Sequence, residues 1–192
     1  QPLQPIPDAD VVCYGLWLDA DIAKDHGVFV SSHEKPTELE YMLQKPSKER
    51  LAELQRTHFY LTDIGIWLFS DKAVKVLMEH SLRKDGTITD YDMYTTFGGA
   101  LGYAPTVNDS AINSLKVAIL PLPGGEFYHF GTSHEIISSM LSIQNLVNDQ
   151  RLIMHHSLKP QPSIFIQNSL VIKKPTKENR NVWIENSCIG PH

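Results

Sequence analysis

The stretch Leu43-Gln44-Lys45-Pro46 decides how this chain is interpreted, together with the apolar run Thr62-Asp63-Ile64-Gly65-Ile66-Trp67-Leu68-Phe69 that follows a short spacer. In the first stretch, a strand delivers a lysine and ends at a proline, which cannot continue the hydrogen-bond ladder of a sheet. In the second, a single glycine interrupts a strand of bulky side chains. The pair predicts a lysine aimed at a phosphate beside a surface that admits a sugar ring.

The sequence around these stretches alternates strands and helices. Continuous apolar runs predict buried strands, and polar residues before apolar periodicity predict capped helices. The expected strands are 10–18, 28–30, 39–45, 59–69, 116–122 and 126–130, and the expected helices are 47–55, one beginning after Ser70, one ending at Leu101, and one beginning after Thr132. This alternation predicts an α/β layered domain.

The segment before Lys45 carries two conflicting signals. Thr37 and Glu40 have the spacing of a helix capping box. Leu39, Tyr41 and Leu43 alternate with polar residues, which is the period of a strand. We take the alternation, so the segment is predicted to be a strand that ends at Lys45.

The last part of the chain contains an internal repeat. Ile166-Gln167-Asn168-Ser169-Leu170-Val171 recurs as Ile184-Glu185-Asn186-Ser187-Cys188-Ile189, eighteen residues later. Three hexapeptides make one coil of a parallel β-helix, in which each repeat places an aliphatic residue inward. The predicted division is therefore 1–156 for the α/β domain and 157–192 for the start of a β-helix.

The composition excludes several functional classes. The chain has 192 residues, 42% of them hydrophobic, and a net charge of -5, so it can bury a core but offers no basic surface for nucleic acid. No apolar run is long enough for a transmembrane helix, and no signal peptide is recognisable. Cys13 and Cys188 lie in apolar runs and are predicted to be buried free thiols, which fits a reducing, cytoplasmic compartment.

Lys45 is the strongest catalytic candidate. A lysine fixed at a strand end can meet a phosphate as a point charge, although an ordinary solvated lysine would fit the same pattern. Gly65 requires either a bulge or the close approach of a ligand. Gly131-Thr132 precedes a helix N-terminus, which can bind an anion or serve as a plain cap.

Candidate metal ligands are weaker. Asp19 with Asp21, and Asp90 with Asp92, resemble carboxylate pairs for Mg²⁺, but each pair also stands at a predicted helix start, where aspartate interacts with the helix dipole. The pairs His129–His134 and His155–His156 lack the further ligands that a zinc site needs.

Taken in order, these motifs resemble the later half of a sugar-nucleotide pyrophosphorylase, or nucleotidyltransferase, domain. Gly27-Val28-Phe29-Val30 matches the family's Gly-Val-Val strand, Gln44-Lys45-Pro46 its Glu-Lys-Pro, and Asp63-Ile64-Gly65-Ile66-Trp67 its Asn-x-Gly-Ile-Tyr strand. Phe127-Tyr128-His129-Phe130-Gly131-Thr132 matches a conserved turn into a helix. Within that superfamily, the sequences of these motifs are similar to those of the L-fucose-1-phosphate guanylyltransferase group, which includes bacterial bifunctional fucokinase/guanylyltransferases.

The resemblance implies a fold and a reaction. The fold would be the C-terminal half of a nucleotidyltransferase-like mixed sheet with flanking helices, followed by the start of a left-handed parallel β-helix. The reaction would convert GTP and L-fucose 1-phosphate into GDP-L-fucose and pyrophosphate, with Mg²⁺ as cofactor. Lys45 would hold the sugar phosphate, and Gly27, Gln44, Asp63 and Gly65 would line the sugar.

Two positions depart from the family pattern. Gln44 replaces a glutamate, so that contact to the sugar is neutral. His129 stands where the family has a metal-binding aspartate, and a neutral imidazole is a poor Mg²⁺ ligand. Either one ligand is lost, or Glu126 substitutes for it.

The resemblance also predicts what this segment lacks. In the family, the glycine-rich nucleotide-phosphate loop and the first metal aspartate precede the part that matches this chain. The chain is therefore expected to be a fragment that holds the sugar-phosphate side of a site and is inactive alone. Unpaired sheet or β-helix edges would allow self-association.

Two other functions compete with this one. A non-catalytic sugar-phosphate-binding or assembly module would account for Gln44 and His129. A sugar kinase would need a Gly/Ser-rich phosphate loop, which this sequence does not contain.

Overall fold

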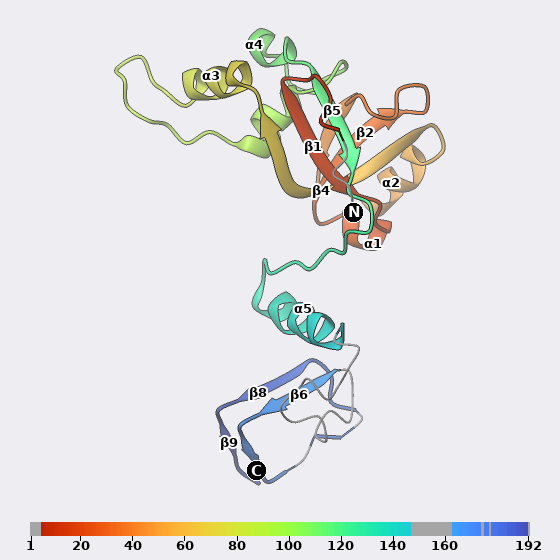
Figure 1. Cartoon of the computed structure of the whole chain (residues 1–192), viewed down its shortest axis with the longest axis vertical. Coiled ribbons are helices and arrows are strands. Elements are labelled where there is room, and N and C mark those ends of the chain that lie inside the picture. Colours follow the sequence, from red (N-terminus) through yellow and green to blue (C-terminus); the bar gives the residue numbers. More distant parts are fainter. Residues whose placement is uncertain (1–4, 147–162, 174, 177, 192) are drawn as a thin grey trace. The chain divides into compact units, whose positions relative to one another are not determined.

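The computed structural model describes residues 5–146, 163–173, 175–176 and 178–191. Contacts divide the chain into two compact units, Gln1–Glu126 and Phe127–His192, which are described separately (Figure 1). The predicted boundary between residues 156 and 157 lies outside the described residues, so the predicted domain division stays a prediction.

The first unit is built on a mixed five-stranded sheet with the order β3-β2-β4-β1-β5. Its strands are β1 (Val11–Leu16), β2 (Gly27–Ser32), β3 (Tyr41–Gln44), β4 (His58–Phe69) and β5 (Val117–Pro121). β1 and β5 are parallel, and all other neighbours are antiparallel. The predicted α/β class with a mixed sheet is confirmed at this level.

Short helices connect these strands. They are α1 (Ala20–Ala23), α2 (Lys48–Leu54), α3 (Asp71–His80), η1 (Met93–Gly98) and α4 (Ser110–Asn113). Ser70 caps α3 as predicted, since its hydroxyl accepts a hydrogen bond from Ala73 N at 3.2 Å. Ser47, predicted as the first residue of a helix, caps α2 by accepting from Arg50 N at 3.2 Å.

The helix expected to end at Leu101 differs in length and winding. Its regular part is η1, a π-helix of six residues. Asp92 starts it by accepting hydrogen bonds from Tyr94 N at 2.8 Å and Thr95 N at 3.0 Å. An aspartate at this position satisfies free N–H groups, which is the structural explanation of the Asp90–Asp92 pair.

The segment before β3 joins the two edges of the sheet. Leu39 N donates to Val117 O at 3.4 Å, and Ile119 N donates to Thr37 O at 2.9 Å. Residues 37–39 thereby pair with β5, although β3 and β5 are the opposite edge strands. The capping box at Thr37 does not form a helix, and the alternation correctly predicts extended chain.

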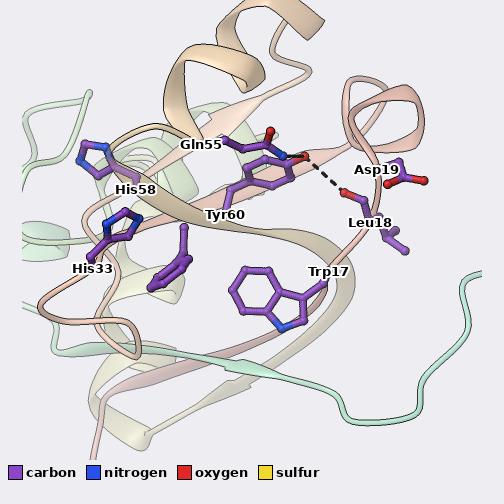
Figure 2. Close-up of a pocket in the computed structure, with 8 residues that line it drawn as sticks. Trp17, Leu18, Asp19, His33, Gln55, His58 and Tyr60 are labelled. Atoms are coloured by element: carbon purple, nitrogen blue, oxygen red, sulfur yellow. Dashed lines mark hydrogen bonds between the residues drawn. The ribbon is translucent and has the colours of Figure 1, made fainter.

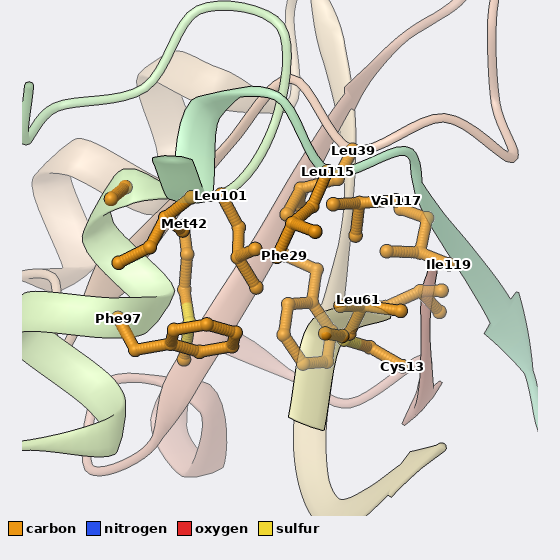
Figure 3. Packing of buried hydrophobic residues seen from close by; sticks show 14 residues of the cluster. Cys13, Phe29, Leu39, Met42, Leu61, Phe97, Leu101, Leu115, Val117 and Ile119 are labelled. Carbon is orange, nitrogen blue, oxygen red and sulfur yellow. The ribbon is translucent and has the colours of Figure 1, made fainter. Parts of the chain in front are cut away.

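The larger core lies on one face of the curled sheet (Figure 3). It contains Val11, Cys13, Phe29, Leu39, Met42, Leu61, Ala73, Phe97, Ala100, Leu101, Ile112, Leu115, Val117 and Ile119. Burying one of the larger apolar side chains of this core stabilises the fold by roughly 1.5–3 kcal/mol. A smaller core on the other face contains Ala23, Val28, Val30, Leu51, Leu54 and Tyr60, so α2 covers the sheet on the side predicted from Leu51 and Leu54.

The second unit contains helix α5 (Ser133–Asn145) and four strands. The strands are β6 (Ile164–Gln167), β7 (Leu170–Val171), β8 (Val182–Glu185) and β9 (Cys188–Ile189). β6 pairs with β8 and β7 with β9, both parallel, and Ile164 faces Val182 while Leu170 faces Cys188. Each pair joins residues eighteen positions apart, so the repeat seen in the sequence is a structural repeat.

Several local predictions are wrong. Residues 126–130 are extended or irregular chain and are not part of a strand. Cys188 is exposed, whereas Cys13 is buried as predicted, because the coil of the second unit gives Cys188 no covering layer. Val74 and Met78 on α3 and Ile136 on α5 have the helical spacing of apolar residues but are exposed, so the buried stripe of each helix is narrower than its run of apolar positions.

Over the described ranges, no helix is both long enough and apolar enough to span a lipid bilayer.

Candidate functional site

Four residues on four neighbouring strands lie side by side across the sheet. Gly15 pairs with Asp63, and Gly27 pairs with Gln44. Val28 pairs with Thr62, which sets Gly27 beside Asp63. Residues in register on neighbouring strands point to the same face. We call these four residues the glycine row, and it contains three of the predicted sugar-lining residues.

The absence of a side chain at Gly27 shapes this row. A Cβ atom placed there would lie 3.0 Å from Gln44 Oε1, 3.4 Å from Asp63 Cβ and 2.7 Å from Met42 Cε. Gly27 is buried, and the side chains of Met42, Gln44 and Asp63 occupy the space that a Cβ atom would need. The glycine therefore allows the two polar side chains to lie close together over the backbone.

Asp63 is a buried carboxyl group with two fixed donors. Its side chain is 6% exposed, and its Oδ1 atom accepts hydrogen bonds from Gly65 N at 2.8 Å and Trp67 Nε1 at 3.0 Å. Burial raises the pKa of Asp63, while the hydrogen bonds from Trp67 and Gly65 and the charge of His26 act in the opposite direction. The carboxylate is held by the protein instead of water.

Gly65 forms a bulge in β4. Tyr14 pairs with Ile66 and Gly15 with Asp63, so Ile64 and Gly65 have no partner on β1. Gly65 has a φ of 76°, which glycine adopts without the penalty of a side chain. Of the two explanations for this glycine, the bulge is confirmed. Contact with a ligand stays a prediction.

Lys45 follows the last residue of β3 and adopts an unusual backbone conformation. Its φ is 48°, and its N–H donates to His26 O at 3.0 Å. The other non-glycine residues with positive φ among those described are all asparagines, which tolerate this conformation better than lysine. Strained residues of this kind concentrate at functional sites.

The Lys45 side chain is exposed, and its ammonium group forms no ion pair or hydrogen bond with any residue in the described ranges. Its charge contributes to lowering the pKa of Asp25, for which the hydrogen bond from Lys24 is the main cause. Lys45 thus stands one residue from Gln44, at the end of the glycine row, as a cation available to an anionic ligand.

The predicted metal ligands belong to different units. Glu126 is the last residue of the first unit, and His129 lies in the second. His129 Nδ1 is 3.2 Å from Glu135 Oε1, and its ring stacks on Phe127 with centroids 5.9 Å apart. The hydrogen bond from His129 lowers the pKa of Glu135. Glu135 had no predicted role at the site, so its contact with His129 was missed.

These donors do not fit Mg²⁺. The ion prefers oxygen ligands in octahedral geometry, and the described residues contain no group of three or more His, Cys, Asp or Glu side chains arranged to hold a metal. The imidazole of His129 already pairs with a carboxylate. We therefore derive no catalytic step through a metal ion.

Some of the other polar candidates have structural partners. Thr132 caps α5 by accepting a hydrogen bond from Glu135 N at 3.3 Å, so the plain cap explains Gly131-Thr132. Asp21 forms an ion pair with Lys48. His155 and His156 lie outside the described residues.

A separate hollow of about 310 Å³ lies beyond the end of β1 (Figure 2). It is lined by Trp17, Leu18, Asp19, His33, Gln55, His58, Phe59 and Tyr60. The Trp17 and Phe59 side chains are 58% and 40% exposed and meet edge to face at 5.9 Å. Their rings could contact the apolar face of a ligand. Sequence reasoning placed both residues in strands and missed this hollow, in which Asp19 is the one lining residue that the sequence had offered as a candidate, for a metal.

The hydroxyl of Tyr60 closes one side of this hollow. It donates to Leu18 O at 3.3 Å and accepts from Gln55 Nε2 at 3.1 Å (Figure 2). His58 is also engaged, with Glu40 Oε2 3.2 Å from its Nε2. Most polar groups of the hollow thus serve the fold, in contrast to Lys45.

Comparison with known proteins supports the resemblance seen in the sequence. No family model matches the chain. The chain is 56% identical over all 192 of its residues to an L-fucokinase/L-fucose-1-P guanylyltransferase of Bacteroides fragilis. The match covers 100% of this chain and 20% of that protein. The predicted resemblance to a bifunctional fucokinase/guanylyltransferase is confirmed over the whole of this chain, which spans about one fifth of the length of that protein.

Proposed function

Because the chain is related over its whole length to one fifth of a bifunctional L-fucokinase/L-fucose-1-P guanylyltransferase, we propose that it is the sugar-phosphate-binding part of a nucleotidyltransferase. The complete enzyme forms GDP-L-fucose and pyrophosphate from GTP and L-fucose 1-phosphate. The isolated chain is inactive, since it supplies one side of the site.

The observation that carries this proposal is the glycine row next to Lys45. Strand register brings Gly27, Gln44 and Asp63 together, although they are far apart in the sequence. They place a neutral amide and a carboxyl group close together, which suits a ring that carries hydroxyl groups. Lys45 adds a cation at the end of the row, where a phosphate on the ring would be neutralised.

The chemistry asked of these residues is modest. An oxygen of the sugar phosphate attacks the α-phosphate of GTP in line, so positioning and charge neutralisation supply most of the rate enhancement. Asp63 and Gln44 orient the sugar through its hydroxyls. Lys45 holds the attacking phosphate and offsets its negative charge.

The finer description of the fold belongs to the same proposal. The mixed sheet of the first unit is the later half of a nucleotidyltransferase sheet. The parallel pairing of residues eighteen positions apart in the second unit is the start of a left-handed β-helix, which further repeats would extend.

In a bifunctional protein, the kinase activity serves as an internal control for a test of the nucleotidyltransferase activity. Gly27→Val in the full-length enzyme fills the row with a side chain, so kcat/KM for pyrophosphate release from GTP and L-fucose 1-phosphate should fall at least about tenfold. ATP-dependent phosphorylation of L-fucose by the same variant should be unchanged.

The matched control is Gly99→Ala. Its added methyl group also meets side-chain atoms, with Val107 Cγ2 at 2.9 Å, but lies outside the row. Equal effects of the two substitutions on pyrophosphate release, or a loss confined to fucose phosphorylation, would contradict the proposal.

A second candidate is a non-catalytic module that binds a sugar phosphate or mediates assembly. The ion pair of His129 with Glu135 at 3.2 Å favours it, because a residue at the expected metal position is engaged elsewhere. In that case, L-fucose 1-phosphate would bind the full-length protein without pyrophosphate release.

A further inference from the structure

The two oxygen atoms of Asp63 have different surroundings. Oδ1 accepts both hydrogen bonds, from Gly65 N and Trp67 Nε1. The Ile64 N–H also acts on this carboxyl group and lowers its pKa, less than the bonds from Trp67 and Gly65 do. Asp63 is 6% exposed, and Oδ2 is not one of the buried side-chain atoms that lack a partner. An ionised carboxyl group has about four acceptor sites, so Asp63 can accept a further hydrogen bond.

The bulge at Gly65 makes the contact between Asp63 and Trp67 possible. Four residues of regular strand span about 13 Å. With Ile64 and Gly65 looped out of the ladder, the indole nitrogen of Trp67 reaches Oδ1 at 3.0 Å. The bulge in β4 therefore allows the hydrogen bond from Trp67 to Asp63 to form.

The Trp67 ring is fixed by its aromatic neighbours. Its centroid lies 5.8 Å from that of Phe29, 6.4 Å from that of Phe97 and 6.2 Å from those of Phe69 and Tyr94. A ring packed on several sides presents its N–H in one direction. The donor to Asp63 is thus preorganised by the core.

We propose that Trp67 is a positioning residue for the sugar phosphate: its indole N–H, with the Gly65 amide, holds Oδ1 of Asp63 so that Oδ2 accepts a hydroxyl of the sugar. This inference rests on the proposed function, since the ligand is the same L-fucose 1-phosphate. It assigns a role to a residue that does not touch the ligand.

Charge is the second part of this role. Burial favours the protonated form of Asp63, and the hydrogen bond from Trp67 opposes it. The other titratable groups that act on Asp63 are His26, whose charge lowers its pKa, and the buried thiol of Cys13 on β1, whose own pKa is raised by burial and by Asp63. Loss of the indole N–H should raise the pKa of Asp63 and leave it neutral at a higher pH.

The first experiment measures the hydrogen bond in the 192-residue chain itself, without any activity assay. The indole ¹H–¹⁵N signal of Trp67, assigned with Trp67→Phe, should shift with pH at a midpoint above the ordinary value for aspartate, about 3.9. Asp63→Asn should abolish that shift. A Trp67 signal that does not respond to pH, or one that still responds in Asp63→Asn, would overturn the inference.

The second experiment follows kcat/KM of the full-length enzyme against pH. In Trp67→Phe the acidic limb should move to higher pH, with a loss of about tenfold on that limb and recovery at alkaline pH. A purely structural role for Trp67 predicts an equal loss at every pH, and that result would overturn the inference. Phe69→Leu, which alters an aromatic neighbour without an N–H donor, should leave the limb in place.

The two experiments separate the two claims. If the wild-type full-length enzyme releases no pyrophosphate from GTP and L-fucose 1-phosphate, the proposed function fails. The titration of the Trp67 indole still decides whether Trp67 controls Asp63.

Discussion

The glycine row and the second unit's coil, which is the pair of parallel ladders formed by β6 to β9, are built in opposite ways. The row depends on irregular features of the chain, which are a bulge at Gly65 and a lysine with φ of 48°. The coil depends on regularity, since Asn186 lies eighteen residues after Asn168 and accepts its side-chain hydrogen bond at 2.6 Å. An irregular backbone places single side chains where a ligand can meet them. A repeated backbone builds a surface on which the next sequence repeat can stack.

Left-handed residues make the contrast concrete. Asn168 and Asn186 adopt positive φ in the coil, where asparagine reduces the cost. Lys45 adopts it beside the row, where an asparagine or glycine would be easier for the fold. The chain therefore has a lysine at a position whose backbone conformation favours asparagine or glycine.

The largest effect is expected from replacing Lys45, the residue that sets the glycine row apart from the coil. Lys45→Ala in the full-length enzyme should lower kcat/KM for pyrophosphate release about 10²-fold or more, equivalent to ~3 kcal/mol of transition-state stabilisation. The reason is the loss of the cation that holds the transferring phosphate. Steady-state kinetics with L-fucose 1-phosphate as the varied substrate measures the effect.

Lys45→Asn is the matched control for the backbone, because asparagine accepts a positive φ. It should lose as much activity as Lys45→Ala while the free energy of unfolding stays the same or rises. A drop in kcat/KM below threefold in both variants would make Lys45 an ordinary strand-end lysine.

The regular region can be tested at Asn186. Asn186→Ala places a residue without a compensating side chain at φ of 50°, which should cost about 1–2 kcal/mol locally. Hydrogen exchange of the amides of β8 (Val182–Glu185) should speed up accordingly. Asn186→Gly should show a smaller change, and an equal loss in both would place the stabilisation in the hydrogen bond to Asn168 instead of the backbone.

The smallest expected effect lies in the first unit, away from the row. His80 Nδ1 lies 2.8 Å from Val76 O, and Nε2 lies 2.7 Å from Asp109 Oδ2. Partial burial opposes a charge on His80, but the hydrogen bonds to Val76 and Asp109 outweigh it and raise its pKa. Both nitrogens can donate only when the ring is protonated.

This contribution to stability is complete below the ordinary histidine pKa of about 6.5 and disappears as the pH rises through the raised folded value. Denaturant unfolding between pH 6 and pH 9, taken as approximate limits around that value, should show the decline. His80→Gln should reduce the free energy of unfolding by about 1 kcal/mol at the acidic end and flatten the curve. A wild-type curve that rises with pH over this range would contradict the assignment.

Sequence alone predicted much of the first unit, because its signals are local. Ser70 caps its helix as expected. In the second unit, the eighteen-residue spacing predicted which strands pair. The site residues came from a resemblance, and strand register then showed that Gly27, Gln44 and Asp63 are neighbours.

The rest depends on contacts between distant residues, which local patterns do not encode. Gly65 was recognised as exceptional, but its bulge is defined by the pairing of β4 with β1. The hydrogen bond from Trp67 to Asp63 follows from that bulge, so no periodicity could reveal it. The joining of the sheet edges through Leu39 is likewise a property of the folded sheet.

The most direct test is a crystal structure of the full-length enzyme with L-fucose 1-phosphate. The phosphate should contact the Lys45 ammonium group, and the sugar should lie over Gly27 with a hydroxyl donating to Asp63 Oδ2. A sugar phosphate bound elsewhere, for example in the hollow beside Trp17, with Gly27 and Asp63 free of it, would contradict the account.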